Sequence, residues 1–123
     1  MTALIDSSAW LDHFMAEKRG LEVRELLKSD EKVVTSSINL FEVYFQSLRK
    51  FPKEAEEIRG YILSRCDVIP ADKEIVRDAA KVKLARGLSM ADSIVWATAE
   101  KHGATIYTSD ADFRGYRPLR LLR

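Results

Sequence analysis

The sequence has little of several residue types that define common classes of small protein. It contains one cysteine, two histidines, three prolines and five glycines among 123 residues. A single cysteine cannot form an internal disulfide, which excludes a disulfide-stabilised scaffold, so we expect Cys66 to be a small buried hydrophobe in a reducing cytoplasm. No apolar run approaches the roughly 20 residues of a membrane span, and the first residues lack the basic segment of an export signal. These absences predict a cytoplasmic protein without a membrane segment.

The remaining composition predicts one globular domain spanning residues 1–123. Hydrophobic residues make up 46% of the chain and charged residues 32%, which are ordinary values for a globular protein. A domain of this length buries enough surface to fold without covalent or metal cross-links. The 20 basic and 19 acidic residues give a net charge of +1. The bulk charge therefore neither favours nor excludes a nucleic-acid partner.

Short apolar segments alternate with longer segments of helical periodicity along the chain. This alternation predicts an α/β domain with a mainly parallel central sheet, whose ligands bind beyond the carboxyl ends of the strands. The predicted strands are residues 2–5, 32–35, 67–69, 104–107 and 119–122, and the predicted helices are residues 9–15, 21–28, 37–51, 53–65, 73–86 and 90–102. The predicted N-terminal caps are Ser7 or Ser8, Ser36 or Ser37, Asp72 and Ser89.

Four carboxylates stand in segments that are otherwise free of charge. Glu42 is the one charged residue in a window of sixteen, and Asp92 is the one charged residue in a window of thirteen. Asp6 is the one charge in the first eleven residues, and Asp110 follows an uncharged run of seven. By contrast, residues 17–32 carry ten charges, as a solvated surface does. A carboxylate in an apolar segment is costly to bury, so each of the four needs a compensating interaction.

Each of these acids also has a structural interpretation. Asp6 and Asp110 are candidate helix and turn caps, Asp92 is a candidate partner of Ser89 in a capping box, and Glu42 is a candidate solvent-exposed helix residue. Taken together they favour a site, because Asp6 and Asp110 end predicted strands while Glu42 and Asp92 lie early in helices that leave the same sheet edge. Converging carboxylates without basic partners repel one another unless a divalent cation compensates their charge.

The available ligands favour Mg²⁺ or Mn²⁺, which prefer oxygen donors. His13 and His102 are too far apart to form a His-x-x-x-His pair, which argues against zinc. Carboxylate-bound Mg²⁺ leaves positions for water and a substrate phosphate, so the sequence predicts phosphodiester hydrolysis. Cys66 has no histidine nearby in the sequence, which argues against a nucleophilic cysteine. A receiver domain of two-component signalling would need paired acids after the first strand, whereas Asp6 stands alone.

Four motifs at these positions resemble a known family. They are Leu4-Ile5-Asp6-Ser7-Ser8, Asn39-Leu40-Phe41-Glu42, Leu88-Ser89-Met90-Ala91-Asp92 and Thr108-Ser109-Asp110-Ala111-Asp112-Phe113. In order and separation they resemble the PIN-domain ribonucleases over nearly the whole chain, and most closely the VapC-type toxins of prokaryotic toxin–antitoxin pairs. The resemblance implies a PIN-like three-layer α/β/α sandwich and a Mg²⁺- or Mn²⁺-dependent endoribonuclease that leaves 5′-phosphate and 3′-hydroxyl ends.

The resemblance also implies a set of site residues. Asp6, Glu42 and Asp92 match the three nearly universal acids of the family, and Asp110 matches the fourth, so all four are the predicted catalytic and metal-binding residues. Glu42 is either a metal ligand or the group that positions the attacking water.

Four further residues beside these motifs are open to two interpretations. Ser8 and Thr108 match polar positions beside the metal, and their alternative role is in caps and turns. We interpret Asp112 as a solvated turn acid, although it is a candidate substitute for Asp110. Trp96 stands where the family often has a small residue, and we expect it in the core or an interface.

The resemblance implies two protein partners, an antitoxin encoded by an adjacent gene and a second copy of the chain. The helix at residues 37–51 has more apolar residues than one buried face needs, so we expect some of them to be exposed. These residues are Ile38, Leu40, Phe41, Tyr44, Phe45, Leu48 and Phe51. The terminal arginines, Arg114, Arg117, Arg120 and Arg123, form either a solubilising tail or phosphate contacts. The alternative functions are a stand-alone RNA-processing nuclease and a catalytically inactive PIN-like module that binds RNA or protein.

Overall fold

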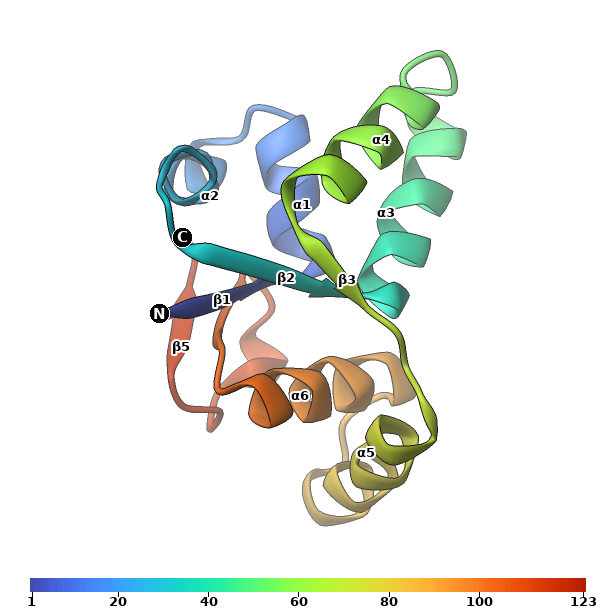
Figure 1. Ribbon diagram of the computed structural model, residues 1–123, viewed down its shortest axis with the longest axis vertical. Helices are drawn as coiled ribbons and strands as arrows, with labels where there is room; N and C mark the ends of the chain where they lie inside the picture. The colour runs from blue at the N-terminus through green and yellow to red at the C-terminus, as the bar shows by residue number, and fades with distance from the viewer.

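The computed structural model describes residues 1–123 and contains one five-stranded sheet. All neighbouring strands are parallel, in the order β3-β2-β1-β4-β5, so β1 is central (Figure 1). The strands are β1 Thr2–Ile5, β2 Lys32–Ser36, β3 Asp67–Ile69, β4 Thr105–Thr108 and β5 Leu119–Leu121. The predicted parallel sheet is confirmed, with the ends of three strands shifted by one residue.

Six α-helices cover both faces of the sheet. They are α1 Ser7–Phe14, α2 Leu21–Lys28, α3 Ser37–Lys50, α4 Ala55–Arg65, α5 Lys73–Arg86 and α6 Met90–His102, with short 3₁₀ helices η1 Lys18–Gly20 and η2 Ala111–Phe113. Figure 1 shows α1 to α4 on one face and α5 and α6 on the other, which confirms the predicted three-layer α/β/α sandwich. None of these helices has the length and apolar character needed to cross a membrane.

Local capping chemistry sets the starts of three helices, α3, α5 and α6, where the sequence predicts them. Ser36 begins α3 with a capping box completed by Asn39. Asp72 and Ser89 cap α5 and α6, each side chain accepting a backbone N–H three residues on. Both helices end at glycines in the left-handed conformation, a geometry that disfavours any residue with a Cβ. These signals act within a few residues of each boundary, so they can be recognised from the sequence alone.

Two predicted helix starts are wrong. The first helix begins at Ser7 instead of Ala9, with Asp6 at the N-cap position and no capping hydrogen bond from its side chain. The hydroxyls of Ser7 and Ser8 do not cap this helix, because they bond to distant side chains. Helix α4 begins at Ala55, since the three residues before it form a turn closed by the Glu54 N–H and the Phe51 carbonyl at 3.0 Å.

The two faces of the sheet have separate hydrophobic cores. Ala3 and Ile5 face α1 to α4 and pack with the fully buried Trp10, whereas Leu4 faces α5 and α6 and packs with Trp96. Trp96 is 3% exposed and contacts the Tyr116 ring edge-on at 5.1 Å, so the expectation of a core role is confirmed. The sheet is therefore a rigid platform on which the carboxyl ends of β1 and β4 are fixed.

Cys66 lies at the end of α4, where it is half-buried rather than fully buried. Its thiol donates to the Ile62 carbonyl at 3.2 Å. Burial raises the pKa of this thiol to about 11. The thiol therefore stays protonated at neutral pH, which agrees with the expectation that it is not a nucleophile.

Candidate active site

Three carboxylates converge where α6 begins and β4 ends. Asp92, Asp110 and Asp112 each offer an oxygen, and these oxygens lie within 4.8 Å of one another. Asp92 comes from the first turn of α6, and the other two come from the turn that follows β4. We call these three residues the acid cluster. No ion pair joins any of its members to a basic side chain, so its charges are uncompensated within the chain.

The environment of Asp92 disfavours its ionisation. Burial raises its pKa to about 7, with further contributions from the charges of Asp110, Asp6 and Asp112. The Ser89 hydroxyl caps α6 by accepting the Asp92 N–H at 3.0 Å, but the Asp92 carboxylate does not complete the capping box. The capping interpretation therefore applies to the Ser89 hydroxyl, while a hydrogen bond with Ser89 lowers the pKa of Asp92 against the larger effect of burial.

Asp6 lies beside the acid cluster, at the carboxyl end of the central strand, and is 5% exposed. Its carboxylate accepts hydrogen bonds from Thr108 Oγ1 at 2.7 Å, Asn39 Nδ2 at 3.0 Å and Ser8 Oγ at 3.2 Å. Burial raises the pKa of Asp6, these hydroxyl hydrogen bonds oppose the rise, and the Glu42 charge adds to it. The carboxylate is held in one orientation by three side chains from different segments.

Glu42 is joined to Asp6 through a short chain of hydrogen bonds. The Ser7 hydroxyl donates to Glu42 Oε1 at 2.6 Å and accepts from Asn39 Nδ2 at 2.9 Å. Because Asn39 Nδ2 also donates to Asp6, one amide group sets the relative positions of both acids. Asn39 is fully buried, and its Oδ1 accepts the Ser36 N–H at 3.1 Å.

Thr108 and Ser8 connect Asp6 to the turn that carries the acid cluster. Thr108 Oγ1 accepts the Asp110 N–H at 3.0 Å while it donates to Asp6. Ser8 Oγ lies 3.1 Å from Thr108 Oγ1 and accepts the Ser109 N–H at the same distance. Both hydroxyls therefore position carboxylates and the turn rather than cap a helix.

The structure differs from the sequence prediction in the grouping of the acids. It brings Asp92 and Asp110 into direct proximity, and it adds Asp112, which the sequence analysis interprets as a solvated turn acid. Asp110 also serves as a turn cap, since its carboxylate accepts the Asp112 N–H at 2.9 Å. Asp6 and Glu42 are neighbours linked through Ser7 and Asn39 and are not members of the acid cluster. The turn that Asp110 closes is what carries the exposed Asp112 toward Asp92.

Sequence reasoning missed the buried polar residues that hold the acids. Asn39 and Ser7 occur within the quoted motifs, but nothing in their spacing indicates a bond across 32 positions. A usable signal was present in Asn39, which stands one helical turn before Glu42 in an apolar segment and, like Glu42, needs a partner once buried.

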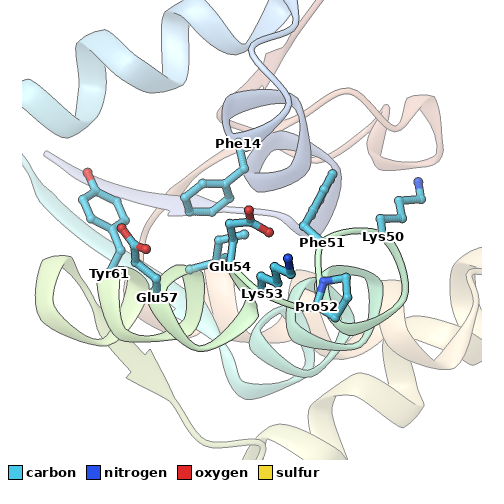
Figure 2. Close-up of a pocket in the computed structure, with 9 residues that line it drawn as sticks. Phe14, Lys50, Phe51, Pro52, Lys53, Glu54, Glu57 and Tyr61 are labelled. Atoms are coloured by element: carbon cyan, nitrogen blue, oxygen red, sulfur yellow. The ribbon is translucent and has the colours of Figure 1, made fainter.

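A separate hollow of about 670 Å³ lies away from the acids. Figure 2 shows that its lining comes from α1, from the end of α3 and the turn that follows it, and from α4. The lining residues are Phe14, Lys50, Phe51, Pro52, Lys53, Glu54, Glu57, Ile58 and Tyr61. Apolar rings mix with charges of both signs, and no acid of the candidate site is included.

The sandwich, the parallel sheet and the acids at its carboxyl edge define an α/β/α protein with an acidic candidate active site. The model of one family, the PIN domain, matches residues 3–117. The chain therefore belongs to the PIN domain family. A comparison with curated proteins gave no significant match.

Several solved structures share this fold over nearly the full chain. A toxin–antitoxin complex from Klebsiella pneumoniae contains a chain with 21% identity and a TM-score of 0.84, covering 96% of this chain and 95% of that one. A VapC toxin from Mycobacterium tuberculosis, described as cleaving the sarcin–ricin loop, has 20% identity and a TM-score of 0.76, covering 94% of both chains. A VapBC complex from Rickettsia felis bound to promoter DNA contains a chain with 17% identity and a TM-score of 0.77, covering 98% of this chain and 97% of that one. These likenesses establish a shared fold.

Proposed function

We propose that this protein is a Mg²⁺- or Mn²⁺-dependent endoribonuclease and the toxin of a VapBC-type toxin–antitoxin pair. The observation that carries the proposal is the acid cluster of Asp92, Asp110 and Asp112. Membership of the PIN domain family and a fold shared with VapC toxins support it. A cytoplasmic location follows from an RNA substrate and is part of the same proposal.

The donor set fits a hard divalent cation. Every nearby ligand is a carboxylate or hydroxyl oxygen, which Mg²⁺ and Mn²⁺ prefer. The raised pKa of Asp92 reflects burial and like charges, and a cation would relieve the repulsion among those charges. In our proposal Asp6, Asp92 and Asp110 hold the metal, with Asp112 as an additional ligand.

The protein's own groups have separate roles in this proposal. Bound metal lowers the pKa of a coordinated water and neutralises charge on the phosphate. Glu42, fixed by the Ser7 hydroxyl, is either a further ligand or the group that orients the attacking water. Asn39 and Thr108 keep the acids in place, and hydrolysis breaks the P–O3′ bond to leave the 5′-phosphate and 3′-hydroxyl ends implied by the family resemblance.

Cleavage of total RNA tests this function directly. We expect the wild type to cleave RNA in Mg²⁺ or Mn²⁺ and not in EDTA, and we expect Asp92→Asn to lose at least about 100-fold in rate, because the variant loses a metal ligand. Gel analysis of end-labelled RNA gives both the rate and the end groups. Wild-type protein that is inactive on structured and unstructured RNA with either metal would contradict the endoribonuclease proposal for those substrates. Activity restored by zinc alone would contradict the oxygen-ligand argument.

We also propose that the chain forms a homodimer and binds an antitoxin. Phe41, Phe45 and Leu48 form one stripe of α3 and are 66%, 47% and 46% exposed, as the sequence analysis expects. An exposed apolar stripe of this kind is typical of a protein interface. The hollow lined by α1 and α4 is a second surface for a protein partner.

The oligomeric state tests the α3 stripe. We expect the wild type to have the mass of a dimer and Phe45→Asp to have half that mass, because a charge in the stripe must be desolvated on association. Leu84→Asp is the matched control, since Leu84 is 90% exposed on α5 in the opposite layer. Light scattering measures the mass, and co-expression with the neighbouring gene tests the antitoxin. A monomeric wild type that co-purifies with nothing would contradict both partners, and a neighbour that is not an antitoxin would favour a stand-alone nuclease.

A further inference from the structure

Arg86, the last residue of α5, has an exposed guanidinium that no acid neutralises. It forms no ion pair and no hydrogen bond, whereas Arg19 is paired with Asp12 and Arg120 with Glu22. None of the five N–H donors of its guanidinium therefore has a partner within the chain. An arginine that is exposed and unpaired is common, so its position matters more than its exposure.

This guanidinium is fixed in place by two neighbouring segments. Its central carbon lies 4.4 Å from the centre of the Trp96 ring, in a cation–π contact. On another side, Nη1 lies 3.4 Å from where a Cβ on Gly115 would be. Gly115 has φ +100°, a conformation that favours glycine, and this keeps the space beside the guanidinium open. The buried Trp96 is itself held by Tyr116, so the cation rests on a rigid support.

The same two segments carry the acid cluster. Trp96 follows Asp92 by four residues on α6, so the two lie on one face of the helix, one turn apart. Gly115 follows Asp112 by three residues in the turn after β4. Arg86 therefore contacts the same two segments that carry the carboxylates. Arg114 and Arg117, which flank Gly115, are also exposed and unpaired.

We propose that Arg86 is a phosphate-binding residue for RNA, holding a backbone phosphate next to the one at the acid cluster. The proposal rests on the proposed function. A polyanionic strand approaching three carboxylates is repelled unless cations beside them attract the flanking phosphates. The planar guanidinium offers paired donors to phosphate oxygens, and stacking on Trp96 reduces the entropy lost on binding. Arg86 is thus a positioning residue that does not contact the reacting atoms.

The test measures RNA binding separately from cleavage. Fluorescence anisotropy of a labelled single-stranded RNA of mixed sequence is followed in EDTA over a series of KCl concentrations. We expect Arg86→Gln to bind about tenfold more weakly than wild type and to reduce the slope of log affinity against log salt by about 0.7, the value for one phosphate contact on a single strand. Glutamine keeps a chain over Trp96, so thermal melting shows whether the fold is preserved.

Two further variants separate charge from structure. Arg86→Lys keeps the charge, so we expect it to keep the salt slope while losing part of the affinity. Arg77→Gln is the matched control on α5, because the Arg77 guanidinium is already 3.9 Å from Glu74 and Asp78; we expect it to bind RNA like the wild type.

The outcomes distinguish this proposal from the proposed function. If Arg86→Gln binds RNA with the same affinity and salt slope as the wild type and still cleaves it, the role of Arg86 is overturned and the nuclease assignment stays intact. Wild-type protein that neither binds nor cleaves RNA would overturn both. Loss of antitoxin binding in Arg86→Gln, with unchanged RNA binding, would assign the guanidinium to a protein carboxylate and overturn the phosphate role.

Discussion

In metal-free buffer at pH 8, the Asp92→Asn variant should unfold at a higher temperature than the wild type. Ionised Asp92 is partly buried beside Asp110 and Asp6, and asparagine removes the charge with almost no change in shape. Most point substitutions destabilise a protein, so a substitution that stabilises it is informative about the strain at this position.

The pH dependence of this difference follows from the raised pKa. The pKa of Asp92 is about 7 in the folded protein and 3.8 in its ordinary environment, so the folded state binds the proton more tightly. Below about pH 4 the acid is protonated and does not lower the free energy of unfolding. As the pH rises from 4 to 7, ionised Asp92 lowers this free energy increasingly, and the loss is complete above pH 7. We expect the two proteins to melt together near pH 4 and to diverge between pH 4 and 7, with the variant higher. Differential scanning fluorimetry in EDTA across this pH range measures the difference in melting temperature between the two proteins.

Adding Mg²⁺ should reverse the order of stability. For an assumed dissociation constant of about 1 mM, roughly 10 mM Mg²⁺ stabilises the wild type by about 1.4 kcal/mol, or about 5 °C in a domain of this size. The variant lacks one ligand and should gain little. Asp72→Asn is the matched control, because Asp72 caps α5 and asparagine is an equally good cap. Equal responses to Mg²⁺ in wild type and Asp92→Asn, at fixed ionic strength, would refute the assignment of Asp92 as a ligand.

Asn39→Leu should weaken both the fold and the site. The substitution leaves the Ser36 N–H and one oxygen of Asp6 without their side-chain partner, and the Ser7 hydroxyl keeps only its bond to Glu42. Each unsatisfied buried group costs about 1–3 kcal/mol, so we expect a loss of at least about 2 kcal/mol. Because Asn39 orients Asp6 and, through Ser7, Glu42, the affinity for Mg²⁺ should also fall by about 10- to 100-fold.

A second buried polar residue of α3 separates these two effects. Ser47 is fully buried and donates only to the Val43 carbonyl of its own helix. We expect Ser47→Ala to change stability modestly and to leave Mg²⁺ affinity unchanged. Urea unfolding gives the stability of each protein, and the Mg²⁺-induced shift in melting temperature gives the affinity. If the Asn39→Leu protein folds and binds Mg²⁺ as tightly as the wild type, the Asn39 amide does not position the acids.

The elements that local interactions specify could be predicted from the sequence. Alternating apolar and helical segments predict a parallel sheet between helices, and caps such as Ser89 and stop signals such as Gly103 act within a few residues of each boundary. The isolation of Asp6, Glu42, Asp92 and Asp110 in uncharged segments is also a property of the sequence. It marks them as candidates, because a buried carboxylate needs compensation wherever the chain places it.

The grouping of these acids depends on how distant segments pack together. The order β3-β2-β1-β4-β5 places the central β1 beside β4, and this brings Asp6 next to Thr108, 102 positions away in sequence. The turn closed by Asp110 carries Asp112 into the acid cluster. Whether Ser7 caps a helix or holds Glu42 depends on α3 lying against α1. Hydrogen bonds between distant segments and the desolvation that raises the pKa of Asp92 arise from packing, and packing has no local pattern in the sequence.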